Sequence, residues 1–296
     1  MRETGGRFGP GRGFRPRRSL GQNFLINGGA VETIVRAFGP RPGDLVLEIG
    51  PGQGALTRRI AGRVARLVAI EVDSVLAAGL RETLAPRLAP GSFEVLEADI
   101  LALPPDALVR ALGASAAAPG RVLANLPYNI ATAVILALLP LRPALADVMV
   151  MVQREVAQRI RSAPGPKTYG SLSVLCQAFA RVESIMRLGP GSFRPRPAVE
   201  SEVIHLTLKR PGGTAGADID GFARLVRAAF ASRRKTLLNN LAAITAASGR
   251  RLGAAEAADL ARAAGLDPGR RAEEIPVAGF LALHEAWSAR AGARGL

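Results

Sequence analysis

The feature that most constrains the fold of this chain is an alternation of short β-branched runs with stretches of helical period. The β-branched runs predict strands at residues 45–49, 67–71, 93–97, 122–125 and 147–153. Between them, the apolar spacing predicts helices at 56–65, 74–84, 105–112 and 131–139. Strands that alternate with helices indicate an α/β fold with a mostly parallel, doubly wound sheet, which binds ligands at the carboxyl ends of its strands.

The rest of the chain favours a second, helical domain. Two further strands are expected at 181–188 and 202–208, joined by a Pro-rich turn over 190–197. Residues 209–218 are typical of a linker, and helical period returns at 219–230, 235–244, 254–264 and 276–289. We therefore predict a tail over 1–18, a sheet-containing domain over 19–208 and an all-helical domain over 219–296.

The charge of the chain indicates the class of its partner. The chain carries 39 Lys and Arg against 24 Asp and Glu, a formal net charge of +15, which predicts a polyanionic partner. Nucleic acid is the first candidate and an anionic membrane surface is the second. Only three of the basic residues are lysine. Arginine binds phosphate with two hydrogen bonds and stacks on bases, but a composition bias of the whole proteome would also produce this preference.

The first 18 residues hold six arginines among Gly and Pro. We expect a disordered basic tail, which either adds non-specific RNA affinity or is a solvated extension. The tail lacks the apolar run of a secretory signal, and no apolar run elsewhere reaches the ~20 residues that span a bilayer. We therefore expect a cytoplasmic protein that does not bind a membrane.

Cysteine and histidine are too scarce for a metal centre. Cys176 is the only cysteine and lies in an apolar stretch, where a buried thiol is expected. His205 and His284 are the only histidines, and they lie far apart in the sequence. We therefore expect no disulfide and no metal site.

A glycine-rich turn follows the first predicted strand, where residues 47–55 read Leu-Glu-Ile-Gly-Pro-Gly-Gln-Gly-Ala. Glycines let a backbone approach a ligand closely, and the pattern Gly50-x-Gly52-x-x-Ala55 fits the dinucleotide fingerprint. Glu71 ends the next strand, where an acid binds ribose hydroxyls in nicotinamide and in adenosylmethionine proteins alike. The glycine-rich turn and Glu71 are therefore compatible with a nicotinamide cofactor and with adenosylmethionine. A tight turn that binds no ligand is the third alternative.

The next two strand ends separate these alternatives. Asp99 follows the third strand, where its carboxylate can accept a hydrogen bond from an adenine amino group. The fourth strand runs into Asn125-Leu126-Pro127-Tyr128, and this order of polar residue, apolar residue, proline and aromatic residue matches the motif of adenine-N6 and related amino methyltransferases. A plain Asn-Pro turn is the structural alternative.

The chemistry of amine methylation explains these residue types. The lone pair of the adenine N6 amine is delocalised into the ring, so hydrogen-bond acceptors must draw the nitrogen toward tetrahedral geometry. The Asn125 side-chain oxygen and the Leu126 carbonyl can accept the two N6–H bonds, and Pro127 keeps the turn extended without a competing N–H. Both acceptors also stabilise positive charge that develops on the nitrogen. Tyr128 can stack on a flipped-out base.

Further candidates lie outside this motif. Phe193 stands in a Pro-rich loop with Arg194 and Arg196. We expect Phe193 to cover the other face of the target base and the two arginines to bind RNA; an ordinary hydrophobic plug under a loop is the alternative for Phe193. Three consecutive cations begin a predicted helix, and they either bind phosphates or form a solvated helix end: Arg233, Arg234 and Lys235.

A series of longer motifs keeps one order between residues 17 and 241. The series comprises residues 17–25 with Gly-Gln-Asn-Phe-Leu, 46–57, Glu71-x-Asp73, Glu97-Ala98-Asp99, 125–130, 151–157, 169–174, 193–197 and 230–237 with Arg-Arg-Lys-Thr-Leu. Together these motifs resemble the small-subunit (16S) ribosomal RNA adenine N6-dimethyltransferase family.

The resemblance implies a Rossmann-like class I methyltransferase domain followed by a smaller C-terminal all-helical domain that binds rRNA. It implies S-adenosyl-L-methionine as cofactor and dimethylation of two adjacent adenosines near the 3′ end of small-subunit rRNA, by a monomer acting on a pre-ribosomal particle. By motif position, the cofactor would contact Asn23, Leu25, Gly50, Glu71, Asp99 and Asn125. The target adenine of the rRNA would contact Asn125, Leu126 and Tyr128.

Two other classes of function stay open at this point. A family-like binding module that assists ribosome assembly or transcription would not need the intact motif at 125–128. A nicotinamide oxidoreductase would bind NAD in place of adenosylmethionine. The large-subunit rRNA methyltransferases that confer macrolide resistance share the nucleotide-site motifs, but Leu126 and the run at 233–237 disfavour them.

Overall fold

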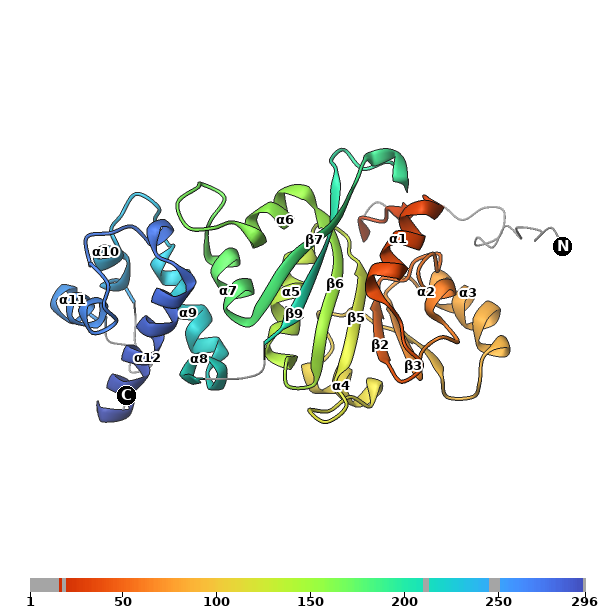
Figure 1. Ribbon diagram of the computed structural model, residues 1–296, viewed down its shortest axis with the longest axis horizontal. Coiled ribbons are helices and arrows are strands. Elements are labelled where there is room, and N and C mark those ends of the chain that lie inside the picture. The colour runs from red at the N-terminus through yellow and green to blue at the C-terminus, as the bar shows by residue number, and fades with distance from the viewer. Residues whose placement is uncertain (1–15, 18–19, 210–212, 245–250, 295–296) are drawn as a thin grey trace. The chain divides into compact units, whose positions relative to one another are not determined.

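Two compact units make up the computed structural model, which describes residues 16–17, 20–209, 213–244 and 251–294 (Figure 1). Unit 1 comprises Met1–Ala157 and Glu183–Leu208, and unit 2 comprises Gln158–Val182 and Lys209–Leu296. Residues 158–182 therefore group with the C-terminal helices, whereas the sequence pattern grouped them with the sheet. Apart from Pro16 and Arg17, the predicted basic tail lies outside the described residues.

Unit 1 is built on a seven-stranded sheet with the order β4-β3-β2-β5-β6-β9-β7. Its strands are β2 (Leu45–Ile49), β3 (Arg66–Glu71), β4 (Phe93–Glu97), β5 (Gly120–Asn125), β6 (Leu145–Gln153), β7 (Ala180–Leu188) and β9 (Ser201–Leu208). Neighbouring strands from β4 through β6 are parallel, and β9 runs antiparallel to β6. The predicted α/β fold with a mostly parallel sheet is confirmed. The strand order reverses between β2 and β5, which favours a binding crevice at their carboxyl ends.

Helices precede, connect and follow the parallel strands. They are α1 (Gly28–Phe38), α2 (Thr57–Ile60), α3 (Ser74–Leu84), α4 (Pro105–Leu112), α5 (Ala131–Leu138) and α6 (Arg154–Arg161). Asn27 caps α1 by accepting a hydrogen bond from Ala30 N at 3.1 Å, and Gly39 ends the helix at φ 59°. Ile34 and Phe38, on the apolar face of α1, belong to the same buried cluster as residues of β2, β3 and β5.

Helix α2 is shorter than the sequence predicts. The apolar spacing favours a helix over 56–65, but α2 covers only Thr57–Ile60. Ala61 leaves the helical region with ψ 132°, and Gly62 follows with φ 77°. A glycine in the left-handed conformation ends a helix whatever the hydrophobic spacing around it, so the predicted length is wrong.

Unit 2 is largely helical. Its helices beyond α6 are α7 (Ser171–Phe179), α8 (Gly213–Ala217), α9 (Ile219–Ala229), α10 (Leu237–Leu241), α11 (Ala254–Ala263) and α12 (Val277–Arg294). Aromatic rings form much of its core, since Phe230 packs against Tyr169 and Phe280 with ring centroids 6.0 and 5.5 Å away. The buried Tyr169 hydroxyl donates to the Ile275 carbonyl at 2.8 Å, which satisfies its polar end.

Two segments of unit 2 differ from the sequence expectation. Residues 209–218, predicted as a linker, include α8. The helix predicted over 235–244 begins later, because Thr236 caps α10 by accepting a hydrogen bond from Asn239 N at 3.4 Å. The prediction that three cations begin this helix is wrong, and the turn before α10 holds all of them: Arg233, Arg234 and Lys235.

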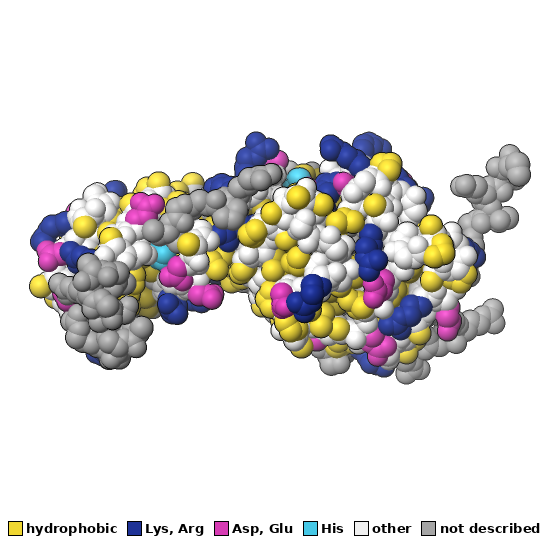
Figure 2. All heavy atoms as spheres, turned by 90° about the horizontal axis from the view of Figure 1, so that it is seen from below, with side chains coloured by type: hydrophobic (Ala, Val, Ile, Leu, Met, Phe, Trp, Pro, Cys, Tyr) yellow, Lys and Arg dark blue, Asp and Glu magenta, His cyan; other side chains and the backbone are white. Residues whose placement is uncertain are grey.

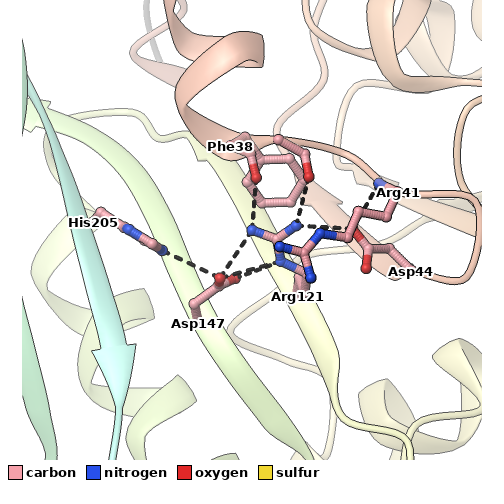
Figure 3. Close-up of polar contacts among 7 residues, drawn as sticks. Phe38, Arg41, Asp44, Arg121, Asp147 and His205 are labelled. Atoms are coloured by element: carbon pink, nitrogen blue, oxygen red, sulfur yellow. Dashed lines mark hydrogen bonds and ion pairs between the residues drawn. The ribbon is translucent and has the colours of Figure 1, made fainter.

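A partly buried ion-pair network lies near the starts of β5 and β6 (Figure 3). The Arg121 guanidinium donates to Asp147 at 2.9 Å, to Asp44 at 2.8 Å and to backbone carbonyls at the end of α1. Burial would raise the pKa of Asp147, but hydrogen bonds from His205 and Arg121 outweigh it and hold the pKa below its usual range. The network therefore ties three strands and α1 together at the sheet end opposite the strands' carboxyl ends.

Among the residues that the structure describes, no helix is long and apolar enough to cross a membrane. No group of three or more His, Cys, Asp or Glu side chains in this part of the chain is placed to hold a metal ion. Cys176 is the buried thiol that the sequence predicts, and burial raises its pKa to about 12.

Candidate functional site

A pocket opens at the carboxyl ends of β2, β3, β4 and β5, where the strand order reverses. It holds about 990 Å³, including space open to solvent. Its lining brings together the predicted cofactor contacts, the predicted catalytic motif and the predicted second aromatic: Asn23, Leu25, Gly50, Glu71, Asp99, Asn125, Leu126, Pro127, Tyr128 and Phe193.

The glycine-rich turn after β2 forms one side of this pocket. Gly50 and Gly52 have φ of 67° and 56°, values that favour glycine over any other residue. A Cβ at Gly50 would lie 3.1 Å from the Asn125 carbonyl oxygen, and a Cβ at Gly52 would lie 2.9 Å from the Phe24 ring. The turn therefore packs against the end of β5 on one side and against β1 (Phe24–Leu25) on the other.

Glu71 ends β3 and is held by two backbone N–H groups. Gly52 N donates to Oε2 at 2.9 Å, and Asp73 N donates to Oε1 at 3.0 Å. Burial raises the pKa of Glu71, and these two bonds offset the rise only in part. Each carboxylate oxygen can accept more than one hydrogen bond, so Glu71 can still receive bonds from the two hydroxyls of a ribose.

Asp99 and Ile100 follow β4 and line the same pocket. Asp99 Oδ1 accepts a hydrogen bond from Leu101 N at 2.9 Å, which fixes the carboxylate. Asp99 is exposed, whereas Ile100 is buried. This pair presents an acceptor beside an apolar surface, an arrangement that suits the amino group and the face of an adenine.

Asn125 ends β5 with an available side chain. This side chain has no hydrogen bond within the described part of the chain, so its oxygen can serve as an acceptor. The Pro127 carbonyl begins the turn that leads into α5, because it accepts from the backbone N of Ile130 and of Ala131, each at 3.2 Å. Leu126, between them, is 3% exposed, so the backbone of the motif is fixed by packing on one side and by the helix on the other.

Tyr128 is oriented by a partner that the sequence did not reveal. Its hydroxyl lies 2.6 Å from the Ser201 hydroxyl at the start of β9. Burial raises the pKa of Tyr128 in spite of this bond, so the phenol is neutral at physiological pH. The ring is therefore an uncharged aromatic surface on the pocket wall, held at its far end.

Phe193 lies in the short strand β8 (Phe193–Arg194), which pairs antiparallel with β1. It is 2% exposed and belongs to the core cluster of unit 1, as a hydrophobic plug would, and it also lines the pocket. Arg194 and Arg196 are exposed and do not line the pocket. In the sequence they lie one and three positions after Phe193.

The three predicted phosphate contacts of unit 2 lie outside the pocket lining, and all of them are exposed: Arg233, Arg234 and Lys235. Arg233 has a structural contact within its own unit, since Nη2 donates to the Tyr169 carbonyl at 2.9 Å. This bond connects the turn before α10 to the aromatic core of unit 2.

Sequence reasoning missed Glu48, which lies inside β2 and lines the pocket while only 2% exposed. Its Oε2 atom has no hydrogen-bond partner among the described residues. Burial raises the pKa of Glu48 to about 8; the polar groups of Thr57 act against this rise, and the nearby charge of Glu71 adds to it. A charged residue inside an otherwise apolar parallel strand is the signal that would have found it.

The described lining of the pocket lacks the basic side chains that are in excess over the whole chain. Its described lining includes the carboxyl groups of Glu48, Glu71 and Asp99, and no Lys, Arg or His. A dinucleotide brings an anionic pyrophosphate, which favours positive groups. Carboxyl groups instead favour hydroxyls, amines and cations, so the lining disfavours the nicotinamide alternative.

The sheet, its helical extension and the position of the pocket define a class I methyltransferase fold. A dimethyladenosine transferase from Plasmodium falciparum has a TM-score of 0.71 to this chain at 23% identity, covering 92% of this chain and 98% of that one. The 23S rRNA methyltransferase ErmE has a TM-score of 0.63 at 23% identity, covering 90% of this chain and 100% of that one. The predicted fold class is confirmed.

Sequence relatives identify the family within this class. The ribosomal RNA adenine dimethylase family matches residues 13–280. The ribosomal RNA small subunit methyltransferase A of Acidithiobacillus ferrooxidans is 41% identical over 272 residues, which cover 92% of this chain and 94% of that protein. The protein of the same name from Kineococcus radiotolerans is 42% identical over 286 residues, covering 94% and 88%. The chain therefore belongs to the ribosomal RNA adenine dimethylase family, as its motifs predicted.

Proposed function

We propose that this protein transfers methyl groups from S-adenosyl-L-methionine to the N6 amines of two adjacent adenosines near the 3′ end of small-subunit rRNA, within a pre-ribosomal particle. Family membership supports the reaction class, and the names of the relatives support the substrate. The observation that carries the proposal is a single pocket in which the cofactor contacts meet the available Asn125 acceptor.

The pocket fits this cofactor. When bound, S-adenosyl-L-methionine supplies a methyl group on a positively charged sulfur, and a lining of carboxyl groups without basic residues suits that charge. Glu71 accepts from the ribose hydroxyls, and Asp99 accepts from the adenine amino group of the cofactor. The buried carboxyl of Glu48, whose Oε2 has no partner among the described residues, offers one further hydrogen-bonding group. The remaining proposed cofactor contacts are Asn23, Leu25, Gly50 and Asn125.

The residues after β5 act on the target amine. The Asn125 side-chain oxygen and the Leu126 carbonyl accept the two N6–H bonds and so turn the nitrogen lone pair toward the methyl group. The C–N bond forms as the C–S bond breaks, and the same two acceptors stabilise the positive charge on nitrogen. The methylated amine then loses a proton to solvent, so no side chain has to act as a general base in the transition state.

Two aromatic side chains hold the target base. We expect Tyr128 to stack on one face of the flipped-out adenine and Phe193 to cover the other, each such contact contributing about 1–3 kcal/mol. The Ser201 hydroxyl holds the far end of the Tyr128 ring, which limits its rotation. Arg194 and Arg196 then bind the phosphates that flank the base, and the cations of the 233–235 turn bind RNA elsewhere.

The test uses Asn125→Ala and Asn125→Asp with unmethylated small-subunit rRNA. Asn125→Ala removes the acceptor and should abolish formation of N6,N6-dimethyladenosine, measured by mass spectrometry, while RNA affinity is retained. Asn125→Asp keeps an acceptor oxygen and should keep measurable transfer. Undiminished methylation by Asn125→Ala would contradict the mechanism. Wild-type protein that binds the RNA but transfers no methyl group would favour the binding-module alternative.

A further inference from the structure

A buried carboxylate beside the pocket, Asp73, takes no part in the reaction proposed above. Its side chain is 0% exposed. Oδ1 accepts from the backbone N of Val75 at 3.0 Å and of Leu76 at 3.4 Å, which caps α3. Oδ2 accepts from Gln22 Nε2 at 3.0 Å and pairs with Arg17 Nε at 3.5 Å. The two oxygens therefore have separate partners, one set on α3 and one set before β1.

Residues 20–25, here called the N-terminal wall, line the pocket. Phe24 of this wall packs directly on the glycine-rich turn at Gly52. At the other side, Gly21 has φ 61°, and a Cβ there would lie 3.4 Å from the Cβ of Pro127 and 3.1 Å from Asn129 Oδ1. The N-terminal wall therefore contacts both the turn and the 125–130 motif, and any displacement of it would change the shape of the pocket.

The N-terminal wall is attached at both ends. At its C-terminal end, β1 pairs with β8, and Ile26 N donates to the Ser192 carbonyl at 2.9 Å. At its N-terminal end, the attachment is the Gln22 amide, whose Nε2 donates to Asp73 and whose Oε1 accepts from Arg17 N at 2.8 Å. Without Gln22, the buried Oδ2 of Asp73 would keep only the longer pairing with the half-exposed Arg17, a costly arrangement for a desolvated charge.

We propose that Asp73 is a positioning residue, and that its Oδ2 atom holds the N-terminal wall where Asn23 and Leu25 reach S-adenosyl-L-methionine. This inference rests on the proposed function of the pocket. Asp73 also fixes the ribose side of the pocket, because its backbone N donates to Glu71 Oε1 at 3.0 Å. One residue therefore sets the relative position of the N-terminal wall and of the acid that binds the ribose.

Two single variants each remove the hydrogen bond between Gln22 Nε2 and Asp73 Oδ2, one by changing the acceptor and the other by changing the donor. Asp73→Asn keeps an oxygen to cap α3 but replaces Oδ2 with an NH₂ group, which cannot accept from Gln22. Gln22→Ala removes the same bond and leaves the α3 cap intact. Each should raise the Kd for S-adenosyl-L-methionine about 10-fold in calorimetry, with RNA affinity unchanged. The Kd of the double variant, Asp73→Asn with Gln22→Ala, should not exceed the higher of the two single-variant Kd values. Both substitutions remove the same hydrogen bond, so their effects should not add.

A swapped pair tests whether the bond itself is responsible. In Asp73→Asn with Gln22→Glu, the new amide can donate to the new carboxylate, and the Kd should return to within about threefold of wild type. Asp106→Asn, which removes a carboxylate in the first turn of α4 outside the pocket lining, is the control and should leave the Kd unchanged. If Asp73→Asn does not fold, Gln22→Ala decides the question alone.

The outcomes separate this inference from the proposed function. Wild-type protein that binds no S-adenosyl-L-methionine would contradict the proposed function. Wild-type binding together with equally tight binding by Gln22→Ala and Asp73→Asn would overturn the positioning role of Asp73 and leave the proposed function standing. Additive losses in the double variant, or no recovery in the swapped pair, would overturn that role as well.

Discussion

At the scale of single residues, Glu48 is a carboxyl group that the fold keeps protonated at neutral pH. Burial raises its pKa from 4.5 to about 8. The folded state therefore binds this proton more tightly than the unfolded state. The stability that results is present in full below the unfolded pKa, near pH 4.5, and is lost as the pH rises through the folded value near 8.

Glu48→Gln keeps the shape of the side chain and removes its titration. We expect the variant to gain stability relative to wild type as the pH rises from about 5 to 8, by at most about 1.4 kcal/mol per pH unit. Urea denaturation of the cofactor-free protein across this range measures the difference. Glu82→Gln, at an exposed position on α3, should show no such trend. A difference between Glu48→Gln and wild type that stays constant with pH would contradict burial of an ionisable Glu48.

The residues of the site that sequence reasoning found are those whose type is unusual at a strand end. Gly50 stands directly after a predicted strand, and the motif from Asn125 to Tyr128 begins at the last residue of another, so their residue types and positions indicate chemistry without knowledge of the fold. Ser201 gives no such signal, because it lies 73 positions from Tyr128 in the sequence and meets it only in the folded chain. Gln22 and Asp73 lie inside motifs, yet their bond across 51 positions depends on the tertiary structure.

At the scale of elements, the sequence predicts long, strongly patterned strands and helices well and short elements poorly. β2 and β4 both have the predicted bounds. The pattern of β2 is the clearer one, because a parallel strand covered on both faces is nearly all apolar, whereas only Val95 of β4 is buried. Helices α2 and α10 are shorter than predicted because caps and glycine conformations end them. The pairing of β1 with β8 joins two strands of two residues each, which are too short to leave a periodic pattern.

The Arg121 network gives a prediction about how the elements of the sheet hold together. Arg121→Met keeps the length of the side chain but leaves Asp147 and Asp44 without their cation in a mostly buried site. We expect a loss of about 2–4 kcal/mol in the free energy of unfolding, measured by urea denaturation at pH 7. Arg110→Met breaks an exposed ion pair with Asp106 and should cost at most about 1 kcal/mol.

The pH dependence of the stability lost in Arg121→Met tests whether lost charge pairing is the cause. The pKa of Asp147 is lowered in the folded protein. The stability that Asp147 contributes is therefore present in full above the unfolded pKa, near 3.9. It is lost as the pH falls through the lower pKa of the folded state. The gap between wild type and Arg121→Met should therefore narrow at acid pH. A gap that is the same at pH 3 and pH 7 would indicate lost packing rather than lost charge pairing.

At the scale of the whole molecule, the positive charge lies on the surface and not in the pocket. On the face drawn in Figure 2, Lys and Arg side chains stand in separate groups with Asp and Glu among them. Several arginines are already paired, such as Arg59 with Glu32 at 3.2 Å and Arg66 with Glu94 at 2.7 Å. The net charge of +15 therefore indicates a polyanion without showing which cations touch it.

The salt dependence of RNA binding identifies those cations. Each phosphate that a cation neutralises adds about 0.7–0.9 to the slope of log K against log salt. Arg194 and Arg196 are exposed and follow the pocket residue Phe193, so replacing both by Gln should lower the slope for an rRNA fragment by about 1.5 between about 50 and 300 mM salt. Arg59→Gln, which removes an arginine paired with Glu32, should leave it unchanged. A flat wild-type response would contradict a polyanionic partner, and an unchanged slope in the double variant would place the phosphate contacts on other cations.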